Sequence, residues 1–167
     1  MIITKRLSII PCTESDIESI IEIEHHPDNR NFIWQGTYQE HLSEIQDSEH
    51  HLLKFIDKPS HDLVGYTLIH INHHSNIFEL RRIAITKKGL GYGREALKAL
   101  IQHAFDYMNI NRLWLDVYPD NQVGIHLYES LGFVREGILR QNYKSDRGYL
   151  DQIIYSILRE EYQESEY

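Results

Sequence analysis

Three glycines alternate at Gly89, Gly91 and Gly93, where an apolar run ends and a helical pattern begins. Glycine adopts positive φ readily and lets a ligand approach the backbone closely. The first turn of a helix carries unpaired N–H groups and the positive end of the helix dipole, which suit a phosphate. Basic residues add charge at the same place: Lys87, Lys88 and Arg94. We interpret the stretch as a pyrophosphate cradle; the alternative is a tight turn that needs glycine only for its geometry.

The spacing of these glycines differs from that of two common phosphate-binding turns. It is not G-x-G-x-x-G, and no Gly-Lys-Ser/Thr closes it as in a P-loop. The pattern Lys88-x-x-Gly91-x-Gly93 resembles the Arg/Gln-x-x-Gly-x-Gly/Ala signature of the GNAT acyl-CoA N-acyltransferase superfamily, with Lys88 in place of Arg or Gln. A later block, residues 121–133 with Tyr128, resembles the family's Asn…Tyr…Gly-Phe motif. The resemblance covers nearly the whole chain.

The resemblance implies a binding mode for acetyl-CoA. In the family, the strand before the cradle and the next strand splay apart, and the pantetheine pairs with the main chain in the gap. Here that implies main-chain contacts from Ile83, Ala84 and Ile85, with a backbone N–H there binding the thioester oxygen. Asn121 would contact the pantetheine or phosphate arm, or only cap its helix. The residues that would hold the pyrophosphate are Lys88, Gly89, Leu90, Gly91, Tyr92, Gly93 and Arg94.

Amide formation from a thioester requires a base for the amine, stabilisation of the oxyanion and a partner for the leaving thiolate. Glu79 lies on the strand that leads into the cradle, and it resembles the catalytic glutamate of histone-type family members. Its alternative role is a salt bridge with Arg81, Arg82 or a lysine. Tyr128 matches the family's tyrosine that faces the thioester sulfur, where its hydroxyl would hydrogen-bond the leaving thiolate. Its alternative role is a core tyrosine.

The acceptor is an amine that the sequence does not identify. In the family an early helical pair borders the acceptor site, so Trp34 or Tyr38 would touch the substrate, although packing is the more usual role of each. Acidic residues gather between Glu14 and Glu49, within a formal net charge of −8. They indicate either a solvated helix surface or attraction for a cationic amine. Polyamines, aminoglycosides, amino acids and protein N-termini are all possible small-molecule or peptide acceptors.

Composition excludes several other classes of protein. The negative charge argues against nucleic-acid binding. No apolar run approaches the roughly 20 residues of a membrane helix, and no apolar stretch follows Lys5 and Arg6 as in a secretory signal. Cys12 is the only cysteine, which favours a bystander thiol in a reducing cytoplasm. The eleven histidines include adjacent pairs without metal-ligand spacing, so we expect no metal. A homodimer is plausible.

Periodicity outlines the elements that position these residues. Thr13 and Thr37 are expected to cap helices that reach Glu24 and Gln46, and two more helices are expected over 92–108 and 121–131. Strands are predicted over 7–10, 52–56, 63–71, 78–85, 113–117, 133–139 and 152–158, and the acidic tail from Glu160 is expected to fray. We predict one domain over residues 1–167 with a mixed α/β fold: a twisted, mostly antiparallel sheet of about seven strands, helices on both faces, and strands splayed at the acyl-CoA cleft.

Our leading hypothesis is a GNAT-type N-acetyltransferase that moves an acetyl group from acetyl-CoA to a primary amine by direct attack. The chain looks most like the ribosomal-protein-alanine and small-amine branch. One alternative is a non-catalytic acyl-CoA-binding sensor, and another is a mononucleotide-binding domain. The presence of both Glu79 and Tyr128 favours the enzyme over the sensor.

Overall fold

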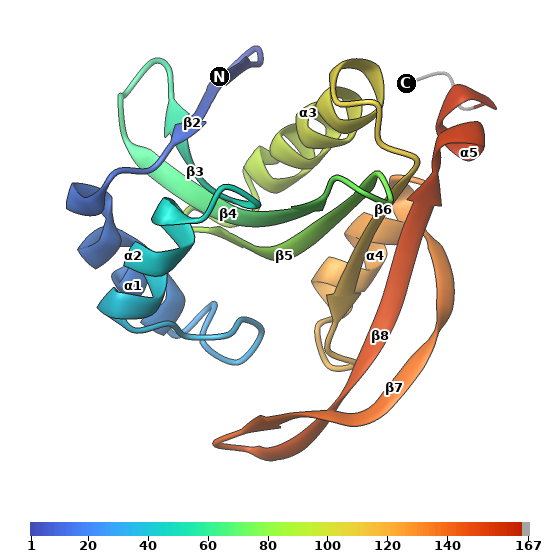
Figure 1. Ribbon diagram of the computed structural model, residues 1–167. Coiled ribbons are helices and arrows are strands. Elements are labelled where there is room, and N and C mark those ends of the chain that lie inside the picture. The colour runs from blue at the N-terminus through green and yellow to red at the C-terminus, as the bar shows by residue number, and fades with distance from the viewer. Residues whose placement is uncertain (165–167) are drawn as a thin grey trace.

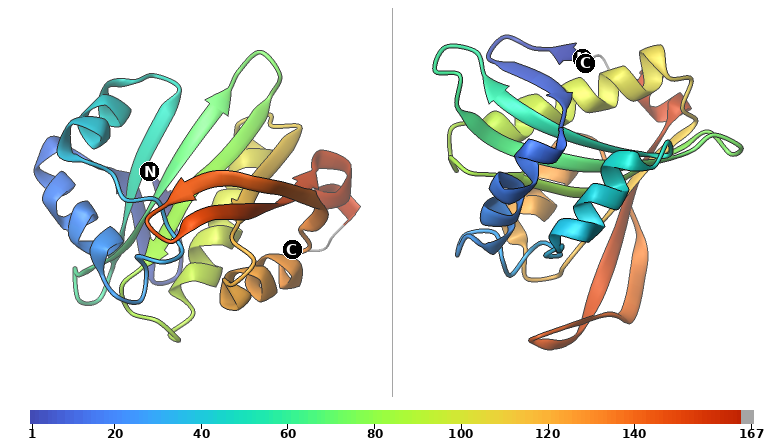
Figure 2. Two further views of the ribbon diagram at one scale, coloured as in Figure 1. Left: turned by 90° about the horizontal axis from the view of Figure 1, so that it is seen from below. Right: turned by 60° about the vertical axis from the view of Figure 1, so that its left-hand side comes forward.

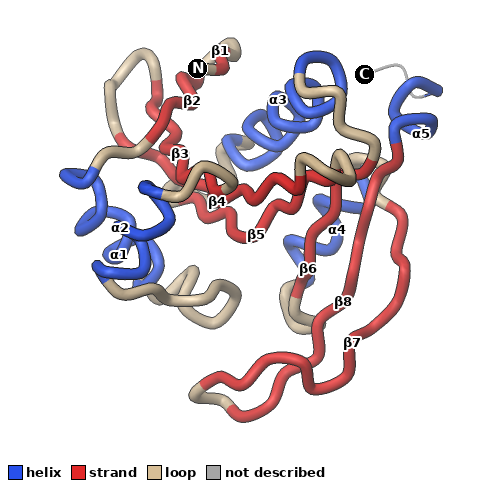
Figure 3. Tube along the Cα trace, viewed as in Figure 1, coloured by secondary structure: helices blue, strands red, loops and turns tan. Residues whose placement is uncertain are grey.

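Eight strands form one twisted sheet in the computed structural model, which describes residues 1–164 (Figures 1 and 3). The order across the sheet is β1-β2-β3-β4-β5-β6-β8-β7, and only β5 and β6 pair in parallel. The predicted mixed, mostly antiparallel sheet is confirmed, with one strand more than the expected seven or so because a short edge strand precedes the first predicted one. The strands are β1 (Ile2–Ile3), β2 (Leu7–Pro11), β3 (His50–Asp57), β4 (Leu63–Asn72), β5 (Ile77–Ile85), β6 (Arg112–Val117), β7 (Val134–Ser145) and β8 (Gly148–Leu158).

Helices cover both faces of the sheet, as predicted. α1 and α2 lie on one face and α3 on the other, and α4 packs beside α3 through a shared apolar cluster (Figure 2). Capping boxes start the first two helical segments, because the carboxylates of Asp16 and Glu40 accept hydrogen bonds from the main-chain N–H groups of Thr13 and Thr37. The helices are α1 (Ile17–His25), preceded by the 3-10 turn Glu14–Asp16, α2 (Tyr38–Gln46), α3 (Tyr92–Tyr107), α4 (Gln122–Ser130) and α5 (Arg159–Glu164).

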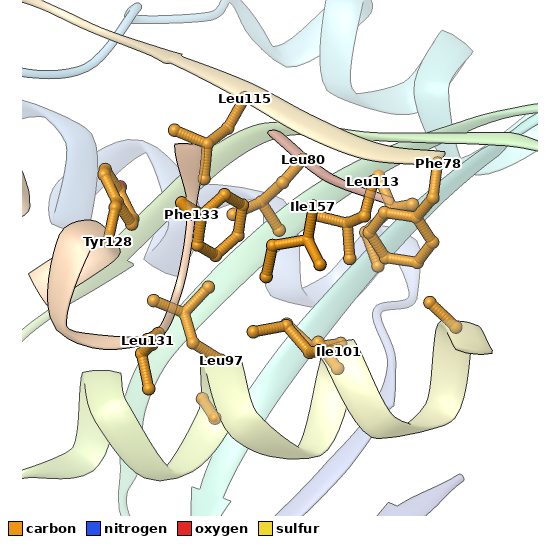
Figure 4. Packing of buried hydrophobic residues seen from close by; sticks show 14 of the residues in the cluster. Phe78, Leu80, Leu97, Ile101, Leu113, Leu115, Tyr128, Leu131, Phe133 and Ile157 are labelled. Atoms are coloured by element: carbon orange, nitrogen blue, oxygen red, sulfur yellow. The ribbon is translucent and has the colours of Figure 1, made fainter. Parts of the chain in front are cut away.

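The larger apolar core lies between the sheet and α3. Leu97 and Ile101 on α3 are buried against Phe78 and Leu80 on β5, and α4 adds Tyr128 (Figure 4). A smaller cluster lies under α1 on the opposite face and includes the buried thiol of Cys12. Burial raises the pKa of that thiol to about 12, and Asp16 adds to the rise while Lys54 opposes it. Cys12 is therefore unsuited to act as a nucleophile.

The β7–β8 hairpin is much longer than the sequence indicated. The predicted strands end at Leu139 and begin again at Gln152, but the ladder continues to Ser145 and Gly148 and forms a ribbon that projects from the sheet (Figure 1). Two register shifts interrupt the ladder, and Gln141 has a φ of 51° at the second. The ribbon is exposed and polar, so it lacks the alternation by which strands are recognised.

The chain after β8 also differs from the prediction. Residues 160–164, expected to fray, belong to α5, and the rest of the predicted tail, 165–167, lies outside the described residues. Within residues 1–164, no helix has the length and apolarity that crossing a membrane requires.

Candidate active site

Strands β5 and β6 separate partway along their length, and this separation creates the site. They pair only over Ile77–Glu79 and Arg112–Trp114. Beyond these residues β5 pairs with β4 and β6 pairs with β8, so the edges of β5 and β6 that faced each other are open. Two residues after Glu79, β5 has a bulge at Arg81, where the register of β4 against β5 shifts. The predicted splayed strands are therefore confirmed.

A cavity of about 930 Å³ extends from the gap between these strands. Its size is typical of small-molecule sites. The wall comes from the loop between α1 and α2, β5, the glycine-rich turn, β6, the start of α4 and the β7–β8 hairpin. The wall contains these residues predicted from the sequence: Trp34, Glu79, Ile83, Ala84, Lys88, Gly89, Asn121 and Tyr128. The predicted residues Tyr38, Ile85, Leu90, Gly91, Tyr92, Gly93 and Arg94 lie outside the wall.

The glycine-rich turn has the geometry expected of an anion cradle. Gly89 and Gly91 have φ values of 76° and 80°, and α3 begins directly after Gly91. Within the described chain, the first main-chain hydrogen bond of α3 runs from the N–H of Glu95 to the carbonyl of Gly91 at 3.1 Å. The earlier N–H groups of the first turn therefore remain open for a ligand, at the positive end of the helix dipole.

Two cations of the cradle bond to protein atoms. Nζ of Lys88 donates to Oδ1 of Asn29 at 2.6 Å, and the guanidinium of Arg94 donates to Oγ of Ser130 at 2.7 Å. Burial lowers the pKa of Lys88, and the nearby charge of Asp28 opposes that fall. The first contact joins the cradle to the loop after α1, and the second joins α3 to α4. Both cations therefore also hold the surrounding segments in place.

Tyr128 and Asn121 reach the cavity from α4. The ring of Tyr128 lies in the core, with its centroid 5.7 Å from that of Phe133 and 6.4 Å from that of Tyr155 (Figure 4). Burial raises the pKa of the Tyr128 hydroxyl, and the charge of Asp116 raises it further. The hydroxyl is therefore a proton-bearing hydrogen-bond donor at neutral pH. Asn121 caps α4, because its side chain accepts a hydrogen bond from the N–H of Gly124 at 3.0 Å.

Glu79 lies where the two strands part. Its Oε1 accepts a hydrogen bond from Nε of Arg81 at 3.1 Å, so the salt bridge that the sequence offered as its alternative role is present. Its Oε2 lies 3.4 Å from Nδ1 of His70, the residue opposite it on β4. The side chain is 16% exposed and lines the cavity. These contacts hold the carboxylate at the edge of the cavity, within reach of solvent.

Asp116 is a second carboxylate in the wall, and sequence reasoning missed it. It accepts a hydrogen bond from Nε2 of Gln152 at 2.8 Å. Burial raises its pKa, the Gln152 hydrogen bond opposes the rise, and the charge of Glu79 adds to it. The alternation of Trp114 and Asp116 along the predicted strand was the available signal, because residues two apart on a strand lie on the same face. Trp114 is opposite Glu79, so Asp116 lies on the side of β6 that faces the site. A carboxyl group with a raised pKa is well suited to accept a proton.

A buried polar network supports the wall on the side of α1 and α2. The carboxylate of Glu24, fully buried on α1, accepts hydrogen bonds from the Tyr66 hydroxyl, the Arg82 guanidinium and the main-chain N–H of Gly36. Nε2 of His41, on α2, lies 3.1 Å from Oε2 of the same carboxylate. Glu24 therefore joins both helices to β4 and β5.

The network continues to the cavity through Glu44 and Trp34. Glu44 bonds to the guanidinium of Arg82 and, at 2.9 Å, to Nδ1 of His41. Burial alone would lower the pKa of His41, but hydrogen bonds and charge from Glu24 and Glu44 raise it to about 9. The Trp34 ring lies 4.4 Å from the Arg82 guanidinium carbon. Trp34 is thus held in the wall by a cation that two carboxylates neutralise.

Two other sequence predictions concern the contact of Tyr38 with the acceptor and the absence of a metal site. Tyr38 donates its hydroxyl to Glu14 at 2.8 Å on the outer side of the helical pair, so its contact with the acceptor stays a prediction. Within residues 1–164, no group of three or more His, Cys, Asp or Glu side chains is arranged to hold a metal ion.

Comparisons with known proteins agree with this geometry. The sequence model of the Acetyltransferase (GNAT) family matches residues 15–133. The spermidine N(1)-acetyltransferase of Vibrio cholerae is 31% identical over 110 residues, 64% of this chain and 63% of that protein. The uncharacterized N-acetyltransferase p20 of Bacillus licheniformis is 38% identical over 74 residues, 44% of this chain and 42% of that one. Each of these matches spans less than two thirds of the relative's length.

A solved structure is similar over nearly the whole fold. The crystal structure of the spermidine N-acetyltransferase from Vibrio cholerae in complex with CoA and spermine has a TM-score of 0.83. It is 22% identical in sequence, and the alignment covers 96% of this chain and 99% of that chain. Both spermidine acetyltransferases are small-amine enzymes, in line with the small-amine part of the branch that the sequence resembles.

Proposed function

The chain belongs to the GNAT acetyltransferase family, and from that premise we propose that it transfers the acetyl group of acetyl-CoA directly to a primary amine. One observation carries the proposal: a cavity lined by the Glu79 and Asp116 carboxylates and by Tyr128 opens where β5 and β6 part, next to an open helix N-terminus. Acetyl-CoA supplies the activated acetyl group as a thioester. The residues of the chain bind it, orient the amine and move the protons.

The open main chain suits the coenzyme. The free edge of β5 at Ile83, Ala84 and Ile85 presents main-chain groups to an extended ligand, as the pantetheine arm is. The first turn of α3 then takes the pyrophosphate, since its N–H groups are open and Gly91 lets the backbone turn toward the ligand. Lys88 and Arg94 supply positive charge beside it, and Asn121 borders the same gap.

Proton removal falls to the pair of carboxylates, Glu79 and Asp116. A primary amine has a pKa of about 10, so most of it is protonated at neutral pH. The two groups interact, because the charge of Glu79 adds to the rise that burial causes in the pKa of Asp116. The pair accepts the proton of the amine, directly or through water. Tyr128 donates a hydrogen bond to the departing thiolate, which strengthens as negative charge grows on sulfur.

The acceptor in this proposal is a flexible polyamine of the spermidine class. Five carboxylates stand against three cationic side chains in the described part of the cavity wall, which favours a ligand with several positive charges. The acidic residues are Asp28, Glu44, Glu79, Asp116 and Asp120, and the cations are Arg81, Arg82 and Lys88. Trp34 presents an aromatic surface on which an ammonium or aliphatic chain can pack. The named activities of the relatives point to the same class.

A panel of amines tests the proposal. The purified protein is mixed with acetyl-CoA and each amine, and free thiol is measured; we expect spermidine and spermine to react faster than amino acids or peptide N-termini. Calorimetry with coenzyme A runs beside it. Coenzyme binding without thiol release on any amine would support the sensor hypothesis, and no coenzyme binding would reject both.

The same proposal includes a cytoplasmic location and a homodimer. Acetyl-CoA and a reduced cysteine are both found in the cytoplasm. Sedimentation velocity at several concentrations tests the dimer.

A further inference from the structure

The β7–β8 hairpin reaches across the sheet to the acceptor end of the cavity. Tyr143 and Gln152 on the hairpin line the wall, and the Tyr143 ring stacks on that of Tyr118 at 5.7 Å between centroids. Figure 2 (left) shows the tip of the hairpin beside the loop that joins α1 and α2. The hairpin therefore forms part of the cavity wall, beside β6.

Arg147, at the tip, joins three segments that are far apart in sequence. One terminal nitrogen of its guanidinium donates to Oδ2 of Asp120, between β6 and α4, at 2.8 Å. The other donates to the main-chain carbonyl of Asn31, between α1 and α2, at 2.5 Å. Both loops contribute neighbouring residues to the wall, among them Phe32 and Asn121. A single planar guanidinium thus joins the α1–α2 loop to the β6–α4 loop at the wall of the cavity.

The turn at the tip holds Arg147 ready for these contacts. Its main-chain N–H donates to Oγ of Ser145 at 3.0 Å, and that hydroxyl bonds to the carbonyl of Gly148 at 3.1 Å. Gly148 has a φ of 96°, a conformation that glycine adopts without strain. The turn is therefore shaped independently of the two loops, and the long side chain bridges from it.

We propose that Arg147 is a positioning residue that fixes the width of the acceptor end of the cavity and so selects slender, unbranched amines over bulky ones. The bridge limits how far the α1–α2 loop can move away from the β6–α4 loop, and Phe32, the neighbour of Asn31, moves with the α1–α2 loop. The proposal rests on the proposed function for its substrate, but its structural part can be tested without turnover.

Hydrogen exchange on the whole protein measures the bridge directly. In Arg147→Ala we expect main-chain amides of residues 27–34 and 143–150 to exchange about tenfold faster, because two charge-assisted hydrogen bonds are lost. Arg140→Ala is the matched control, since Arg140 is exposed on the same hairpin. Unchanged exchange in Arg147→Ala, or an equal rise in the control, would overturn the proposal whether or not the protein acetylates amines.

Acceptor selectivity is the second measurement. The ratio of kcat/KM for spermidine to that for a branched or N-benzylated amine is expected to fall about tenfold in Arg147→Ala, mainly through KM, with kcat for spermidine within about twofold of wild type. Arg147→Lys, which can keep one of the two contacts, should lie between. A uniform loss of kcat on all amines with an unchanged ratio would indicate a merely structural role and would overturn the proposal.

Discussion

Replacing Glu24 by glutamine should destabilise the fold more than any surface charge change, because Glu24 is at the centre of a neutral buried network. Two carboxylates, Glu24 and Glu44, face the cations Arg82 and His41. The raised pKa of His41, about 9, means that the imidazole is charged at neutral pH. Glu24→Gln keeps the shape of the side chain but leaves one positive charge unbalanced, and glutamine offers one acceptor oxygen where the carboxylate offered two.

The magnitude follows from the four donors around the carboxylate. Tyr66 and Arg82 point at Oε1, and Gly36 and His41 point at Oε2, so glutamine leaves two of the four facing its NH2 group. Each buried donor without an acceptor costs about 1–3 kcal/mol. Removal of one partner from a buried ion pair costs about 3–5 kcal/mol. We expect a loss of about 3–5 kcal/mol, which lowers Tm by roughly 6–20 °C in a chain of this length.

Urea unfolding at pH 7 measures this loss, with Glu22→Gln on the same helix as the control, since Glu22 is exposed. A free energy of unfolding equal in the two variants would refute the account of the network. The pH dependence gives a second check. Because the folded pKa of His41 exceeds its ordinary value of 6.5, its contribution is complete below about pH 6.5 and is lost as pH rises through about 9. The shift corresponds to about 3 kcal/mol, and Glu24→Gln should shrink that dependence.

Four substitutions at the site test the chemistry. Tyr128→Phe should lower kcat about 100-fold while KM for acetyl-CoA changes little, since only the hydrogen bond to the leaving thiolate is lost; equal kcat in steady-state assays would remove Tyr128 from the mechanism. Gly91→Ala should weaken coenzyme A binding about tenfold by calorimetry, because alanine is strained at a φ of 80°. Gly137→Ala is the control, because the added methyl group there meets open space. Equal Kd values for the two variants would count against the cradle. Glu79→Gln should move the acidic limb of the kcat/KM profile to lower pH, because loss of the Glu79 charge lets the pKa of Asp116 fall. Asp116→Asn should lower kcat/KM about 100-fold. Unchanged pH profiles in both variants would exclude the pair of carboxylates as the base.

Local patterns predicted the glycine-rich turn well and the polar network poorly. Alternating glycines beside a helical stripe are a local signal, so the turn at Gly91 and the start of α3 could be placed from sequence alone. Glu24 falls on the buried stripe of α1 with Ile17 and Ile20, although the sequence counted it among acidic residues of a solvated surface or of an amine-attracting face. The hydrogen-bond partners of Glu24 lie 12 to 58 residues away, in the loop before α2 and on α2, β4 and β5. No periodicity within one element can show which charges a buried carboxylate meets.

The parting of β5 and β6 is the feature that periodicity could not reveal, and it is also the one that most directly indicates a ligand. Both strands bury every second residue and would pair along their full length if local pattern decided. They separate after Glu79 because each is held by its outer neighbour, β4 or β8, and because the bulge at Arg81 bends β5. Main-chain groups inside a fold are costly without hydrogen-bond partners. An open strand edge within a cavity is therefore stable when water or an extended ligand with its own amide groups completes the ladder, and the pantetheine arm of coenzyme A has such groups.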